Sequence, residues 1–210
     1  MQTINTIIFD LDGTLIDSSV TNINAFHYAL APFGITLTHQ EIDAMRSLTS
    51  NELFQDRLTA AEAKQALSRL WDYSRQSAKE TILFPGINSL LEAIAAKDIT
   101  MGVWTGRDRT STIDIIQHHH IAHYFKAIVG GCEVSKNKPD PEGLYRLISK
   151  LQRDTNNMIH VGDHEHDIVG ANTAGVTSIY AKWHKQPLEC LTQAHYSFDT
   201  IIAFQTWLNL

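Results

Sequence analysis

Near its start the chain reads Thr6-Ile7-Ile8-Phe9-Asp10-Leu11-Asp12-Gly13-Thr14. The first five residues form a short run rich in β-forming residues with no helical period, which is typical of a strand buried on both faces of a sheet. Similar runs recur further along the chain, at residues 99–104, 127–129, 158–161 and 176–180. The sequence therefore predicts five buried strands.

Helical patterns separate these strands. Between the first two runs, apolar residues recur at helical spacing at Ile87, Leu90, Leu91, Ile94 and Ala95. Asp140-Pro141 predicts a helix start, with Asp140 as the N-cap of a helix over residues 143–151. A capped final helix is expected over residues 201–208. The alternation of strand and helix predicts an α/β fold, a doubly wound, mostly parallel sheet with a Rossmann-like core.

The alternation is interrupted between about residues 17 and 83, where we find only helical patterns. One apolar face there combines Ile23, Phe26, Leu30 and Phe33, and another combines Ala63, Ala66, Leu67, Leu70 and Trp71. We therefore expect an inserted all-helical unit over residues 17–84, packed over the sheet's edge, and a Rossmann-like core made of residues 1–16 and 85–210. The connections near residues 16–18 and 83–86 are expected to act as hinges.

Composition limits the partners and the location. The 210 residues (23.6 kDa) are 43% hydrophobic and 19% charged, ordinary values for a chain that buries a core. The net charge of −6 repels polyanions, so no nucleic-acid partner is expected. The two cysteines have neither metal-ligand nor disulfide-framework spacing, and neither a signal peptide nor a membrane span is recognisable. We expect a cytoplasmic protein without a membrane partner, either a monomer or a weak homodimer.

Ligands of an open α/β sheet bind beyond the carboxyl ends of its strands, so the residues after each predicted strand are the candidate site. They are Asp10 to Thr14 after the first strand, Thr105-Gly106-Arg107 after the second, Lys138-Pro139 after the third, and Gly162-Asp163 after the fourth, with Asp167 one helical turn later. Asp10 and Asp12 share a face of the extended chain, and Gly13 lets the backbone turn its N–H groups towards an anion. Carboxylates, a hydroxyl and a cation are expected to meet at one edge.

Charge decides which ligand such a site binds. Two like charges about 4 Å apart repel by about 4 kcal/mol at an effective dielectric near 20, and a phosphate monoester adds about two negative charges. An anion therefore needs cations beside the four carboxylates: Lys138 supplies one charge, and a hard divalent ion supplies two. Ligands that are all oxygens favour Mg²⁺. Paired carboxylates divide into a nucleophile and an acid–base group, but the residues alone do not say which is which.

These segments together resemble the four signature motifs of the haloacid-dehalogenase-like phosphohydrolase superfamily. The similarity is to its phosphoglycolate phosphatase and β-phosphoglucomutase branch, which carries a helical cap after the first strand. It covers essentially the whole chain. The most specific parts are Asp10-Leu11-Asp12-Gly13-Thr14-Leu15-Ile16-Asp17-Ser18 and Gly162-Asp163 with Asp167 and Ala171.

The resemblance implies a role for each of these residues. Asp10 would attack phosphorus and become an aspartyl-phosphate, and Asp12 would be the general acid and then the general base. Thr105 and Lys138 would hold the phosphoryl oxygens. Mg²⁺ would be held by Asp10, the backbone carbonyl of Asp12 and Asp163, with Asp167 in support. The further substrate contacts that we expect are Gly13, Thr14, Gly106, Arg107 and, from the cap, Arg46, with Arg57 as a second cap candidate.

The implied activity is a Mg²⁺-dependent phosphatase acting on a small phosphorylated metabolite, with phosphoglycolate as the first candidate. Asp12 favours a phosphate ester over a haloacid, because the dehalogenase branch lacks this second aspartate. Two positions depart from the motifs: Gly106 and Arg107 follow Thr105 where an Asn is usual, and His164 replaces a usual Ser. The alternatives are a phosphomutase of the β-phosphoglucomutase type and, in another class, a phosphorylation-switched signalling module or an inactive binding protein. The His118-His119-His120 run is interpreted as a polar helix end.

Overall fold

The computed structural model describes residues 4–45, 48, 52–184 and 193–210. Its main sheet has six strands in the order β5-β4-β1-β6-β7-β8, and every neighbouring pair is parallel. The strands are β1 (Thr6–Phe9), β4 (Thr100–Trp104), β5 (Phe125–Val129), β6 (Met158–Gly162), β7 (Thr177–Ala181) and β8 (Tyr196–Phe198). The predicted doubly wound α/β fold is confirmed, and the five predicted strands lie within two residues of their expected ends.

The edge strand β8 was not predicted. It has three residues, and its side chains are exposed or half-buried, so the apolar run that marks a buried strand is missing from it.

Strand β1 lies at the centre of the sheet, where the order of the strands reverses. From β1 the chain builds β4 and β5 on one side, and then crosses to build β6, β7 and β8 on the other. Phe9 pairs with Val103 of β4 and with Val161 of β6, and the N–H of Asp10 donates to the Val161 carbonyl at 2.8 Å. Asp10 therefore leaves the sheet at its topological switch point, the usual ligand position in such folds.

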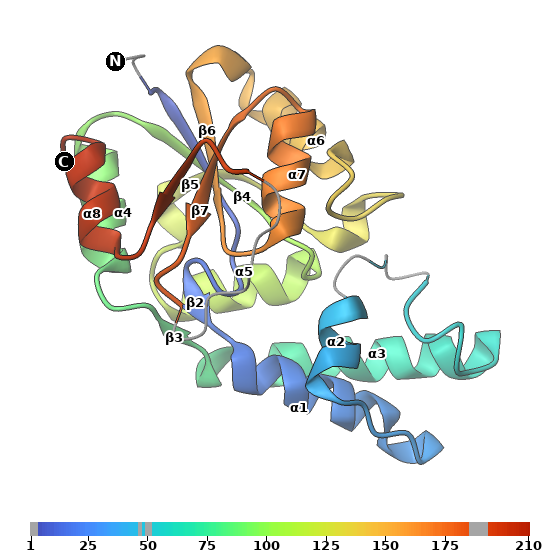
Figure 1. Ribbon diagram of the computed structural model, residues 1–210. Coiled ribbons are helices and arrows are strands. Elements are labelled where there is room, and N and C mark those ends of the chain that lie inside the picture. The colour runs from blue at the N-terminus through green and yellow to red at the C-terminus, as the bar shows by residue number, and fades with distance from the viewer. Residues whose placement is uncertain (1–3, 46–47, 49–51, 185–192) are drawn as a thin grey trace.

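Helices cover both faces of the sheet (Figure 1). The core on one face includes residues of α4 (Ile87–Ala96), α5 (Arg109–His118) and α8 (Ile201–Trp207), and the core on the other includes residues of α6 (Glu142–Leu151) and α7 (Glu165–Thr173). Strand β1 serves both cores, since Ile7 and Phe9 belong to the first and Ile8 to the second. This alternation follows from the two-residue period of a strand.

Two predicted helix starts can be compared with the structure. Thr200 caps α8 as expected, because its side chain accepts the N–H of Ala203. Asp140, however, is not the N-cap of α6. The N-cap position belongs to Pro141, and the Asp140 carboxylate instead accepts the N–H of Glu142 from one residue further back. The Asp140 side chain thus still accepts a free N–H group in the first turn of α6, although Asp140 itself lies in the turn that precedes the helix.

The described residues between positions 18 and 81 form a helical unit with its own hydrophobic core. It contains α1 (Ser19–Leu30), α2 (His39–Ala44) and α3 (Ala60–Gln76), which lie below the sheet in Figure 1. Helices α1 and α3 pack together around buried residues that include Ala25, Ala29, Leu30, Ala66 and Leu70. Capping boxes begin α2 and α3 at Thr38 and Thr59. Short 3₁₀ segments occur at Ala31–Phe33, Ser77–Glu80, Ala122–Tyr124, Gly131–Glu133 and Thr155–Asn157.

The two connections to the helical unit lie side by side. They form a small antiparallel ladder of β2 (Ile16–Asp17) and β3 (Ile82–Leu83), in which Ile16 pairs with Leu83 and Asp17 with Ile82. We predicted no strand here, because a two-residue ladder is too short to show a periodic pattern. Among the described helices, none has the length and apolar character needed to cross a membrane.

Candidate active site

Lys138 is surrounded by carboxylates at the carboxyl end of β1. Its buried ammonium group donates to Asp10 Oδ1 at 2.7 Å, to Asp167 Oδ1 at 2.6 Å and to the backbone carbonyl of Trp104 at 2.8 Å. The ammonium also lies 4.6 Å from the centre of the Trp104 ring. Residues from three distant parts of the sequence thus converge on one cation.

Asp163 completes a cluster of three buried carboxylates. One oxygen each from Asp10, Asp163 and Asp167 lie within 4.8 Å of one another. Two glycines allow this approach: a Cβ at Gly13, whose φ is +86°, would lie 2.1 Å from Asp163 Oδ2, and a Cβ at Gly162 would lie 2.2 Å from Asp167 Cγ. The close approach explains why glycine stands at both positions.

The all-oxygen cluster fits Mg²⁺. Octahedral Mg²⁺ holds its ligands at about 2.1 Å, so two of its ligand atoms are at most about 4.2 Å apart. The three carboxylate oxygens lie within 4.8 Å of one another, so they need to approach by little or nothing to share one ion. Asp167 is already well bonded, because Oδ1 accepts from Lys138 and lies 3.1 Å from His160 Nε2, while Oδ2 accepts the N–H of His164. These contacts fit a supporting position for Asp167, beside direct positions for Asp10 and Asp163.

The electrostatics of the cluster separate its members. Burial raises the pKa of Asp10 well above its usual value, and the carboxylates of Asp167, Asp163 and Asp12 add to the effect against the pull of Lys138. For Asp167, burial also favours the neutral form, but Lys138 and His160 outweigh it and lower the pKa. Burial opposes the charge of Lys138 as well, yet Asp10 and Asp167 raise the pKa of its ammonium. The cluster therefore has more negative charge than one lysine neutralises.

Asp12 forms an ion pair with Arg107, whereas Asp10 forms one with Lys138. Arg107 donates from Nε to Asp12 Oδ2 at 3.0 Å and from Nη2 to Asp12 Oδ1 at 2.6 Å. The hydroxyl of Ser18 and the amide of Asn22 also donate to Asp12 Oδ1. Although burial opposes the charge of Arg107, Asp12 raises the pKa of its guanidinium. The Asp12 carboxylate is not part of the three-carboxylate cluster, and a metal contact through its backbone carbonyl stays a prediction.

The remaining predicted site residues occupy the loops after β1 and β4. The Thr105 hydroxyl is buried and accepts the N–H of Arg107 at 3.1 Å, and Gly106 faces the Asn137 side chain. Thr14 is fully buried, and its hydroxyl finds no hydrogen-bond partner among the described residues. The Thr14 carbonyl accepts the indole N–H of Trp183. The loops after β1 and β4 thus lie at the same edge of the sheet as the carboxylate cluster.

Lys138 is carried by a loop that precedes α6. Glu142, in the first turn of that helix, accepts the N–H groups of Ser135 and Lys136 at 2.9 and 3.0 Å. Asn137 Oδ1 accepts the N–H of Lys138, and Asn137 Nδ2 donates to the carbonyl of Leu48 in the helical unit. Hydrogen bonds therefore hold the loop both to α6 and to the helical unit. The Lys138–Pro139 peptide bond within the loop is cis.

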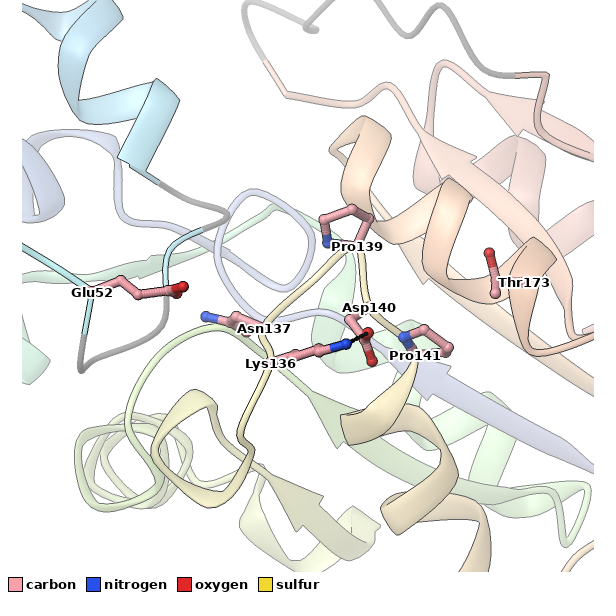
Figure 2. Close-up of a pocket in the computed structure, with 7 residues that line it drawn as sticks. All are labelled: Glu52, Lys136, Asn137, Pro139, Asp140, Pro141 and Thr173. Carbon is pink, nitrogen blue, oxygen red and sulfur yellow. Dashed lines mark ion pairs between the residues drawn. The ribbon is translucent and has the colours of Figure 1, made fainter.

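A shallow cavity of about 530 Å³ opens beside this loop (Figure 2). Its lining combines the loop with one residue of the helical unit and one of α7: Lys136, Asn137, Pro139, Asp140, Pro141, Glu52 and Thr173. Within this lining, Lys136 Nζ and Asp140 Oδ2 form an ion pair at 3.7 Å. The sequence predicted a catalytic, substrate-binding or metal-binding role for none of these seven residues, so the cavity lies outside the predicted site.

Sequence reasoning missed two groups that support the cluster. His160 is a fully buried residue of β6 that lies against both Asp167 and the carbonyl of Ile8, and burial lowers the pKa of its imidazole. Trp104 contributes its carbonyl and its ring to Lys138, and its ring lies tilted by 52° against that of His160, with ring centres 5.0 Å apart. The sequence did contain one indication of His160, because a histidine inside an otherwise apolar strand needs a polar partner.

The cap candidates have different outcomes. Arg46 lies outside the described residues. Arg57 forms ion pairs with Glu41 at 3.1 Å and Asp56 at 3.4 Å, both in the helical unit. In the His118-His119-His120 run, His118 ends α5 and His119 Nε2 lies 2.9 Å from the Thr81 hydroxyl. This position agrees with a polar helix end.

Comparison with known proteins identifies the family. The chain belongs to the haloacid dehalogenase-like hydrolase family, whose model matches residues 7–181. It is 28% identical to a phosphoglycolate phosphatase of Salmonella paratyphi A over 85% of this chain and 81% of that protein, and 28% identical to one of Aliivibrio fischeri over 89% of each. Its fold matches a hydrolase from Pseudomonas syringae with a TM-score of 0.85 and 20% identity, over 98% of both chains. The family and these relatives support the enzyme class predicted from the sequence, a phosphatase.

Proposed function

We propose that this protein is a Mg²⁺-dependent phosphatase that hydrolyses a small phosphorylated metabolite through an aspartyl-phosphate on Asp10. The observation that carries the proposal is the buried cluster of Asp10, Asp163 and Asp167 around Lys138, at the switch point of the sheet. The names of the relatives support phosphoglycolate as the first substrate to test.

The reaction divides into two displacements. A carboxylate oxygen of Asp10 attacks phosphorus as the bond to the leaving oxygen breaks, and Asp12 gives that oxygen its proton. Water then attacks the phosphoryl group on Asp10 and passes a proton to Asp12, which releases phosphate and restores Asp10. Lys138 and Thr105 hold the phosphoryl oxygens during both steps, where charge neutralisation and positioning provide most of the catalysis.

The excess negative charge of the cluster supports the metal. Burial and neighbouring carboxylates disfavour the ionised form of Asp10, yet a nucleophile must be ionised. A Mg²⁺ ion bound by Asp10 and Asp163, by the backbone carbonyl of Asp12 and with the support of Asp167 supplies the positive charge that offsets the carboxylates and the incoming phosphate.

We also propose that residues 17–84 act as a cap over a core of residues 1–16 and 85–210. Two observations support this division: the helical unit has its own hydrophobic core, and its two connections pair with each other at β2 and β3. A cap that moves on these connections would admit substrate and then exclude bulk water. The cytoplasmic location and the monomer or weak homodimer expected from the sequence stay predictions.

Hydrolysis assays test the proposal. The purified protein should hydrolyse p-nitrophenyl phosphate and acetyl phosphate with Mg²⁺, and EDTA should abolish the activity until Mg²⁺ is returned in excess. A panel of phosphorylated metabolites with phosphoglycolate as its first member then identifies the substrate. Absence of hydrolysis across the whole panel in the presence of Mg²⁺ would refute the proposal. Transfer of labelled phosphate into a sugar bisphosphate would instead identify a phosphomutase.

A further inference from the structure

Hydrogen bonds hold the backbone of Arg107 at the rim of the site. Its N–H donates to the Thr105 hydroxyl at 3.1 Å, and its carbonyl accepts the N–H of Gly131 at 2.9 Å. The next residue, Asp108, caps α5 by accepting the N–H of Ser111 at 3.0 Å. The backbone is therefore hydrogen-bonded at Arg107 and at the residue that follows it, which limits the positions that the guanidinium can reach.

The guanidinium binds the Asp12 carboxylate with two nitrogens, at 3.0 and 2.6 Å. The side chains of Arg107 and Asp12 are only 7% and 13% exposed. A bidentate pair of this kind fixes the plane of the carboxylate as well as its position. Because the pair is largely screened from water, its geometry is maintained more strongly than that of a surface ion pair.

The same guanidinium extends into the helical unit. Arg107 Nη2 also donates to Asn22 Oδ1 at 2.6 Å, and Asn22 lies in α1. Asn22 Nδ2 donates to the Ser18 hydroxyl at 3.2 Å, and that hydroxyl donates to Asp12. Asp12, Arg107, Asn22 and Ser18 thus form a closed network that joins the sheet edge, the connection and α1.

We infer that Arg107 is a positioning residue for Asp12, which orients the carboxylate that exchanges protons with the leaving oxygen and with water, and that Asn22 couples this orientation to α1. This deepens the proposed function and rests on it. It also differs from the substrate contact that the sequence predicted for Arg107, because the donors described here are directed to Asp12 and Asn22, while Lys138 is the cation at Asp10.

The choice of leaving group separates positioning from phosphate binding. An alkyl phosphate such as phosphoglycolate expels an alkoxide that needs a proton, whereas p-nitrophenyl phosphate expels a stable anion that does not. A residue that acts through Asp12 therefore matters for the first substrate and much less for the second. A residue that binds the phosphoryl group matters equally for both and also for the binding of inorganic phosphate.

The test measures kcat/KM for both substrates and the inhibition constant of inorganic phosphate in Arg107→Ala, Arg107→Lys and Asn22→Ala. Because a positioned acid contributes about 10²- to 10⁴-fold, Arg107→Ala should lose at least about tenfold more kcat/KM on the alkyl phosphate than on p-nitrophenyl phosphate. The phosphate inhibition constant should stay within about twofold. Arg107→Lys keeps the charge without the bidentate fork and should show the same selectivity, with a smaller loss. Asn22→Ala should show a smaller loss again.

Arg109→Ala is the matched control, because Arg109 lies two residues away and forms a partly exposed ion pair with Glu133 at 3.6 Å. It should behave as the wild type. Equal losses on both substrates together with weaker phosphate inhibition would overturn the inference and make Arg107 a phosphate ligand. Unchanged kinetics in all three variants would overturn it as well. A wild-type protein inactive on p-nitrophenyl phosphate and on every alkyl phosphate of the metabolite panel would contradict the proposed function, and the inference would fail with it.

Discussion

Asp10 and Asp12 stand two residues apart in one loop, but the fold gives them different surroundings. Asp10 faces the inside of the sheet edge, where Lys138, Asp163 and Asp167 surround it and burial raises its pKa. Asp12 faces the connection to the helical unit, where it is held by Arg107. For the nucleophile and the acid–base group that we propose, the difference therefore lies in the neighbouring cation and the neighbouring element, and not in the residue type.

Removing the Asp10 carboxylate should have the largest effect. Asp10→Asn should lose about 10⁴-fold or more in kcat on alkyl and aryl phosphates alike, since it removes the proposed nucleophile. The amide still offers an oxygen to Lys138, so thermal unfolding should show a folded protein. Strong residual hydrolysis by a pure, folded variant would mean that another group is the nucleophile.

Replacing the cation beside Asp10 should reduce both activity and stability. Lys138→Met should lose about 10²- to 10³-fold in kcat, a loss typical of removing one donor that stabilises the transition state. It should also lose about 3–5 kcal/mol in the free energy of unfolding without Mg²⁺, because it leaves buried carboxylates unpaired. Urea unfolding with and without Mg²⁺ measures this, and added Mg²⁺ should restore part of the loss.

Lys136→Met is the matched control for that variant. Lys136 lies in the same loop, but its side chain is 74% exposed in its ion pair with Asp140. Its removal should change the free energy of unfolding by no more than about 0.5 kcal/mol. Similar losses for the two variants would show that the loop, and not the buried charge, accounts for the effect.

Removing the Asp12 carboxylate should separate the two aspartates. Asp12→Asn should lose about 10²-fold or more in kcat/KM on an alkyl phosphate, and distinctly less on p-nitrophenyl phosphate. Asp10→Asn should show no such preference. If both variants lost activity to the same extent on both substrates, the division of roles between the two residues would be wrong.

Binding of Mg²⁺ at Asp10 should stabilise the folded protein even without substrate. At Mg²⁺ about 100-fold above its Kd, the gain is about 2.7 kcal/mol, which raises Tm by about 5–11 °C for a chain of this size. Asp163→Asn should lose most of this rise. Asp56→Asn, which changes an exposed carboxylate of the helical unit, should keep it. A full rise in Asp163→Asn would place the metal elsewhere.

The smallest effect is expected at Glu142, which anchors the Lys138 loop. Hydrogen bonds, led by the Ser135 hydroxyl, lower the pKa of Glu142 to about 2 from a reference of 4.5. The ionised form is favoured by folding, so its stabilising contribution is complete above pH 4.5 and is lost as the pH falls towards 2. The stability difference between wild type and Glu142→Gln, from urea unfolding, should therefore shrink on acidification. A difference independent of pH would contradict the assignment.

Much of the fold could be predicted because the central strands are continuous apolar runs, and because their carboxyl ends must meet at one edge. That reasoning placed Asp10, Lys138, Asp163 and Asp167 at one edge, and the structure brings them together. It could not reveal the partners of Asp12, since the pairing with Arg107 depends on side-chain direction. The contacts of His160 with Asp167 and of Trp104 with Lys138 could not be predicted for a similar reason, because they join strands and loops that are distant in the sequence.

The proposed mechanism requires that Asp10, and not Asp12, carries the phosphoryl group. It is tested by incubating Asp12→Asn with radiolabelled acetyl phosphate and Mg²⁺, quenching in acid, and reducing the acyl-phosphate with borohydride before peptide mass spectrometry. Acid-stable label on the protein is expected, with reduction at Asp10, and no label is expected on Asp10→Asn. Label that persists on Asp10→Asn, or reduction at any other aspartate, would contradict it.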